Sequence, residues 1–96
     1  MATTHPIRLL PQWPGSRRFV DRLRARLANE AFECYLAWRS ECVVLEAAYR
    51  AWRQTSRSHA ALAYVAYTAA LDREECAAGR YRTVLTEAED LLGRAE

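Results

Sequence analysis

Residues 17–53 carry the sequence RRFVDRLRARLANEAFECYLAWRSECVVLEAAYRAWR, which contains neither proline nor glycine. Apolar side chains recur along it at steps of three or four residues and form one stripe: Val20, Leu23, Leu27, Ala31, Cys34, Trp38, Cys42, Leu45, Tyr49 and Trp52. The mean step, about 3.56 residues, lies between the period of an ideal α-helix and that of a heptad repeat. The stretch therefore predicts one continuous helix over about 17–53, with coiled-coil-like packing along the stripe.

A polar stretch then ends the stripe and provides Ser56 or Ser58 as the N-cap of a second helix. The apolar positions of this second run again keep a helical spacing: Leu62, Ala66, Ala69, Ala70, Ala77, Tyr81, Val84, Leu85, Ala88, Leu91 and Leu92. The two runs, about 17–53 and 58–93, are nearly equal in length, which predicts an antiparallel helical hairpin. Gly79 leaves two alternatives open, a helix that continues through it and a three-helix domain broken there.

The composition is typical of a single all-α domain. Of the 96 residues, 51% are hydrophobic and 27% are charged, as in a globular protein. All three prolines and one of the three glycines lie within residues 1–15, so the remainder is nearly free of helix breakers. We expect residues 1–15 to form an extended arm, because Pro6, Pro11 and Pro14 prevent a regular helix there, and residues 16–96 to form one helical-hairpin domain.

Both helices carry apolar residues on more than one face, which the single seam of a hairpin cannot cover. The second apolar face of the first helix consists of Phe19, Phe32, Tyr35, Leu36, Val43 and Val44. The second helix is rich in alanine, whose small side chain lets large residues of the first helix pack closely over it. We expect a second copy of the chain to cover the remaining apolar surface and to form a four-helix bundle with two-fold symmetry.

Charged residues gather where the two predicted helices meet at the open end of the hairpin. Six arginines and one aspartate lie within residues 8–26, whereas acidic residues prevail within 84–96. Each group opposes the dipole of its own helix, so we expect the two groups to form ion pairs with each other. The pairs that the antiparallel register predicts are Arg22 with Asp90, and Arg26 with Glu87 or Glu89.

The same arginines allow a second interpretation. Arg18, Arg22 and Arg26 lie at i, i+4 and i+8 and therefore share one helix face. This arginine stripe is suited to contacts with phosphates, although no helix-turn-helix spacing or zinc-finger ligand set accompanies it. The net charge of +2 does not by itself imply a polyanionic partner.

The sequence contains no constellation of residues typical of catalysis or metal binding. The two histidines, His5 and His59, stand outside any His-Glu-x-x-His spacing. Cys34, Cys42 and Cys76 are an odd number of thiols in apolar helical pattern, which suits buried and reduced side chains. We therefore expect a protein that is not an enzyme, with no catalytic residue, metal or cofactor.

The leading hypothesis is a non-enzymatic interaction or scaffold module that binds a partner protein, and a second copy of itself, by helix packing. The residues we expect to make these contacts are Ile7, Leu10, Trp13, Trp38, Tyr49, Trp52, Tyr64 and Tyr67. We also expect Tyr49, Tyr64 and Tyr67 to form an aromatic cluster near the turn. The alternative is a small nucleic-acid-associated regulatory protein whose arginine stripe makes the anion contacts.

The sequence also indicates where the protein resides. No apolar run approaches the roughly 20 residues that span a bilayer. The first ten residues lack the apolar core of a signal peptide, because His5, Pro6 and Arg8 interrupt it. We therefore expect a cytoplasmic protein with no membrane partner.

Overall fold

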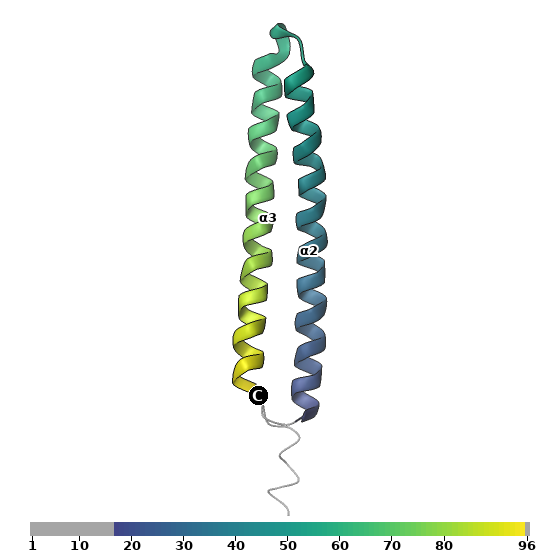
Figure 1. The fold of residues 1–96 in the computed structure, drawn as a ribbon, viewed down its shortest axis with the longest axis vertical. Coiled ribbons are helices and arrows are strands. Elements are labelled where there is room, and N and C mark those ends of the chain that lie inside the picture. The colour runs from purple at the N-terminus through teal and green to yellow at the C-terminus, as the bar shows by residue number, and fades with distance from the viewer. Residues whose placement is uncertain (1–16, 96) are drawn as a thin grey trace, which may run out of the picture.

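The computed structural model describes residues 17–95 and shows two long antiparallel helices joined by a tight turn (Figure 1). Helix α2 spans Arg17–Gln54 (38 residues), the short 3₁₀ helix η2 spans Arg57–His59, and helix α3 spans Ala60–Ala95 (36 residues). The described part of the chain contains no strand, so the predicted all-α helical hairpin is confirmed. The predicted arm over residues 1–15 lies outside the described residues.

Helix α2 is continuous because nothing in its sequence interrupts the helical backbone. It ends at Gln54, one residue beyond the predicted end. Arg53 in its last turn suits the negative end of the helix dipole, whereas the first turn has no acidic residue to balance the positive end. The helix is therefore held by its packing on α3 more than by its own termini.

The turn differs from the predicted serine-capped helix start. Ser56 has an extended backbone (φ −72°, ψ 161°), and its carbonyl oxygen accepts a hydrogen bond of 3.0 Å from the N–H of His59. The Ser56 Oγ does not cap a backbone N–H and lies instead 3.0 Å from Ser58 Oγ and 3.1 Å from His59 Nδ1. Helix α3 begins at Ala60 rather than near residue 58, because a 3₁₀ turn occupies the intervening positions.

Helix α3 runs without a break through Gly79, so the continuous helix is the correct alternative. A methyl group added at Gly79 would meet the Arg82 side chain at 3.7 Å, an ordinary van der Waals distance. Glycine costs about 1 kcal/mol relative to alanine at one helical position. A helix of 36 residues packed along its length tolerates that cost.

The core of the hairpin is a narrow seam between α2 and α3. Its buried residues are Leu27, Cys34, Ala70, Ala77 and Val84. The three on α3 recur every seven residues, the interval that keeps one line of side chains facing a neighbouring helix. No large side chain among residues 17–95 is completely buried. In a pair of helices, each residue is covered by one neighbouring helix only, and the rest of its surface stays open to water.

The substitution Ala70→Leu tests the close approach of the two helices. Ala70 is 1% exposed, so a larger side chain should force the helices apart and lower the free energy of unfolding by about 1–3 kcal/mol. The neighbouring Ala69 is exposed, and Ala69→Leu should change that free energy by less than about 0.5 kcal/mol. Urea denaturation followed by far-UV circular dichroism, at one protein concentration, measures both; equal losses would contradict the close packing at Ala70.

Candidate interaction surface

Four of the predicted interaction residues lie together near the turn. The aromatic rings of Tyr49 and Trp52 on α2 contact those of Tyr64 and Tyr67 on α3, with ring centroids 5.1 to 5.6 Å apart across the seam. The Trp52 and Tyr67 rings are stacked, with an interplanar angle of 14°. The predicted aromatic cluster is thus confirmed, and it ties the two helices together at this end.

A second aromatic cluster lies nearer the middle of the hairpin. Trp38 stacks on Tyr81 with centroids 6.0 Å apart, and Tyr35 contacts both rings. Trp38 therefore does not join the cluster of Tyr49, Trp52, Tyr64 and Tyr67, which lies closer to the turn. Ile7, Leu10 and Trp13 lie outside the described residues.

Trp38 also makes a polar contact that the sequence did not predict. Its Nε1–H donates a hydrogen bond of 2.8 Å to Glu74 Oε2 across the seam, in a partly buried position. Nearby, the Arg73 Nε donates to Glu41 Oε1 over 3.3 Å. Through these two contacts Glu74 and Arg73 connect α3 to α2. The signal that could have found Glu74 is its place seven residues from both Tyr67 and Tyr81, on the line that faces α2.

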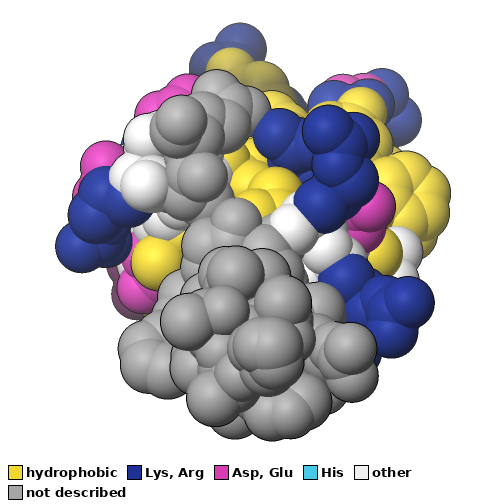
Figure 2. Space-filling view, turned by 90° about the horizontal axis from the view of Figure 1, so that it is seen from below, with side chains coloured by type: hydrophobic (Ala, Val, Ile, Leu, Met, Phe, Trp, Pro, Cys, Tyr) yellow, Lys and Arg dark blue, Asp and Glu magenta, His cyan; other side chains and the backbone are white. Residues whose placement is uncertain are grey.

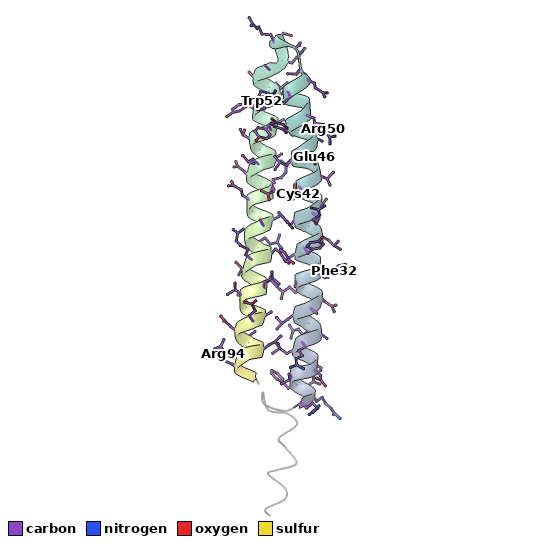
Figure 3. The ribbon with its side chains drawn as sticks, viewed as in Figure 1. Phe32, Cys42, Glu46, Arg50, Trp52 and Arg94 are labelled. Atoms are coloured by element: carbon purple, nitrogen blue, oxygen red, sulfur yellow. The ribbon has the colours of Figure 1, made fainter. Side chains whose placement is uncertain are left out.

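One side of the hairpin is apolar along most of its length. We call it the tyrosine side, and its residues recur every seven positions on each helix: Tyr35, Cys42 and Tyr49 on α2, and Tyr64, Leu71, Ala78 and Leu85 on α3. Tyr35, Tyr49 and Tyr64 keep 37%, 42% and 48% of their surface exposed. An open hollow of about 410 Å³ lies on this side, lined by Cys42, Leu45, Glu46, Tyr49, Tyr67 and Glu74. Glu46, at its rim, forms an ion pair with Arg50 of the same helix (Figure 3).

The opposite side of the hairpin is charged along α3 and largely apolar along α2, where Ala37 and Val44 follow Glu30 at intervals of seven residues. On α3 it carries Arg73, Arg80, Glu87 and Arg94, again at intervals of seven residues. An open hollow of about 510 Å³ on this polar side is lined by Leu23, Arg26, Leu27, Asn29, Glu30, Glu33, Glu87 and Leu91. The two sides of the hairpin therefore differ in chemistry mainly along α3, although they flank the same seam.

A third apolar region lies on the surface of α2 that faces away from α3. Phe32, Leu36 and Val43 are 60%, 50% and 66% exposed, and we call them the outer stripe. Figure 3 shows Phe32 extending from α2 on the side away from α3. The sequence placed these residues on a second apolar face but did not include them in the expected interaction site. Their exposure could not be read from periodicity alone, since a second face can be covered within the hairpin or left open.

The arginine stripe lies exposed at the open end of the hairpin. Figure 2, a view onto this end, shows arginine side chains beside apolar ones. Within residues 17–95, neither Arg22 nor Arg26 forms the predicted ion pair with Asp90, Glu87 or Glu89. The register is nevertheless the predicted one, since Arg26 and Glu87 line the same hollow. The prediction of ion pairing was wrong because long exposed side chains at this end stay solvated, and such pairs are worth less than about 1 kcal/mol.

Comparisons of the chain with protein-family models, with curated proteins and with solved structures gave no match.

The described residues show further features that bear on chemistry. Cys34 is buried, Cys42 is half-buried and Cys76 is exposed, and all three are free thiols. The expectation of buried cysteines is therefore correct for Cys34 and wrong for Cys76, which lies on the outer surface of α3.

No group of three or more metal-ligating side chains occurs between residues 17 and 95. Neither long helix carries a stretch apolar enough to cross a lipid bilayer.

The contact between Trp38 and Glu74 can be tested by removing its acceptor. We expect Glu74→Ala to lower the free energy of unfolding by about 1–2 kcal/mol, because it leaves a partly buried indole N–H without its partner. Glu74→Gln keeps an acceptor oxygen and should recover most of that loss. Urea denaturation followed by tryptophan fluorescence measures the three proteins, with the exposed neighbour variant Glu75→Ala as the control. A similar loss in both alanine variants would show that the hydrogen bond contributes nothing specific.

Proposed function

We propose that this protein is a non-enzymatic interaction module whose helical hairpin binds other protein chains by helix packing. What supports this is the amount of apolar surface that the hairpin leaves open on two faces, the tyrosine side and the outer stripe. Contiguous apolar patches of this kind are uncommon on monomeric proteins and typically mark protein interfaces. The polar side, in contrast, carries charged residues along α3.

The outer stripe is suited to a partner helix. Leu36 lies four residues after Phe32, and Val43 lies seven after Leu36, so the three side chains form one line along about three turns of α2. An amphipathic helix of a partner protein anchors in such a line through apolar residues at i, i+3, i+4 and i+7. Coiled-coil packing of this kind is the binding mode that we propose.

We place the module in the cytoplasm. Its free thiols, among them the exposed Cys76, persist most readily in a reducing compartment. The helices also offer no membrane-spanning stretch within the described residues.

The double substitution Leu36→Gln and Val43→Gln tests the outer stripe. Both side chains are half exposed or more, so the hairpin should remain folded while a partner that packs on the stripe loses tenfold or more in recovery, about 1.4 kcal/mol. The measurement is affinity purification of tagged wild-type and variant protein from the native lysate, with quantitative mass spectrometry and with nuclease-treated halves. The control variant carries Ala37→Gln and Ala51→Gln, at exposed alanines of the same helix. Equal recovery with all three proteins would contradict the proposed function.

One observation favours a second candidate function, the binding of nucleic acid through the arginine stripe. The predicted ion pairs of Arg22 and Arg26 are absent from the described residues, so these guanidinium groups are open to phosphate oxygens. Arg18 is exposed on the same face of α2. Arginine also binds phosphate in a bidentate manner, which suits such a role.

This second candidate predicts a steep dependence of affinity on salt. For a mixed-sequence DNA duplex of 20 base pairs, replacing Arg18, Arg22 and Arg26 by glutamine should reduce the slope of log affinity against log salt by about 3. Fluorescence anisotropy measures this slope when the salt concentration is varied between about 50 and 200 mM. The matched control replaces Arg80, Arg82 and Arg94 on α3, which removes the same charge. The same slope in both triple variants would exclude the arginine stripe as the binding site.

A further inference from the structure

We infer that the tyrosine side of one hairpin packs against the tyrosine side of a second copy, with both turns at the same end of a four-helix bundle. This inference rests on the proposed function, since it names one of the chains that bind by helix packing. It adds which side of the hairpin is covered and how the two copies are oriented.

The choice of side follows from the chemistry of the two flanks of the seam. The tyrosine side carries no charged residue at its seven-residue positions from Tyr35 to Tyr49 or from Tyr64 to Leu85. On α3 the polar side carries Arg73, Arg80 and Glu87 at the equivalent positions, whereas on α2 it carries Ala37 and Val44. Covering the polar side would remove these charges from water, which is costly unless each finds a partner. Covering the tyrosine side buries mostly aromatic and aliphatic surface, which is favourable. The two carboxylates beside its hollow already have partners, since Glu46 pairs with Arg50 and Glu74 accepts from Trp38.

The area of one side matches what a stable dimer needs. A helix of 38 residues is about 57 Å long, and the Cα atoms spread over 15 Å across the long axis. Seen as a flat projection, one complete side therefore measures roughly 850 Å². Specific interfaces of standard size bury about 800 Å² on each partner.

Two dimers with two-fold symmetry bring the tyrosine sides of two hairpins into contact with their long axes parallel. With the symmetry axis along the helices, the turns lie at the same end and α2 of one copy packs on α3 of the other at the same level. With the axis across the helices, the turns lie at opposite ends and α2 packs on α2, and α3 on α3.

Ring contacts within one hairpin show which residues share a level. Trp52 contacts Tyr64, and Tyr35 contacts Tyr81, so on the tyrosine side Cys42 lies near the level of Leu71, and Tyr35 near that of Ala78. With the turns at the same end, Tyr35 therefore faces Ala78 of the second copy, a large residue against a small one. Leu71 of the second copy faces the hollow beside Cys42 and Tyr49 and is placed to fill it.

Charges at the edge of the tyrosine side are consistent with the same orientation. Arg39 lies four residues after Tyr35, and Glu75 lies four residues after Leu71, so each borders this side on its helix. With the turns at the same end, Arg39 of each copy faces Glu75 of the other. With the turns at opposite ends and the copies centred on each other, Arg39 instead lies at the level of Phe32 of the other α2, so its pairing with Glu75 is lost.

The first experiment measures mass and orientation on the full chain. Light scattering at micromolar concentration should give twice 11.0 kDa. A nitroxide attached to p-acetylphenylalanine at position 57, in the turn, should give a spin–spin distance below roughly 35 Å, because neighbouring hairpins lie about 10 Å apart. A mass of one chain would overturn the inference. A dimer with the labels roughly 60 Å apart would overturn the orientation, since opposed turns are separated by the length of a helix.

The second experiment exchanges the charges of Arg39 and Glu75 and measures the dissociation constant of the dimer. Arg39→Glu should raise the dissociation constant of the dimer roughly tenfold, and adding Glu75→Arg to the same chain should restore it. Arg80→Glu, on the polar side, is the matched control and should leave dissociation unchanged. Failure of the exchange to restore the dimer would contradict the contact between α2 and α3 of different copies. A monomer that still recovers its partner through Leu36 and Val43 would overturn this inference while the proposed function stands.

Discussion

The packing of α2 against α3 through the buried residues Ala70 and Ala77 decides where the aromatic rings near the seam lie. Two helices that touch through alanine leave no room between them for an indole or phenol ring. Trp38, Trp52 and Tyr67 therefore spread over the edges of the seam, where they contact each other and stay half-buried. The same geometry holds the helices together through stacked rings and leaves the outer parts of those rings, and of their neighbours, in water. Incomplete burial is thus a direct result of the packing.

The sequence was sufficient for the parts of the fold that depend on periodicity. The unbroken stripe from Val20 to Trp52 predicts α2 to within one residue of its end, and the equal lengths of the two runs predict the antiparallel register. Sequence reasoning failed where a single local interaction decides the outcome. It could not foresee that a 3₁₀ turn would replace the serine cap, because both use the same polar residues. It also missed Glu74, since an acidic residue on a buried line is unexpected until its partner Trp38 is seen across the seam.

For the candidate site too, the sequence predicts what depends on periodicity and misses what depends on local contacts and exposure. Periodicity identifies which residues share a face, so the aromatic cluster near the turn follows from the sequence. It does not tell which of several apolar faces the hairpin itself covers, and so the outer stripe and the tyrosine side became distinguishable only through exposure. The predicted ion pairs of Arg22 and Arg26 failed for a related reason. Register brings opposite charges to one level, but exposed side chains with long flexible stems gain little by closing the last few ångströms.

Self-association through the tyrosine side would also change what the outer stripe does. In a bundle with both turns at one end, the two copies of α2 lie at opposite corners, because each packs on α3 of its own chain and α3 of the other. The two outer stripes then face in opposite directions from a single rigid body. A partner that carries two suitable helices, or two copies of one partner, can therefore be held at fixed separation, and engaging the second stripe benefits from the high effective concentration set by the first. In this arrangement Leu36 and Val43 are separate from the residues that build the dimer, because they lie on a different face of α2 from the tyrosine side, whereas Phe32, seven residues before Arg39, borders that side.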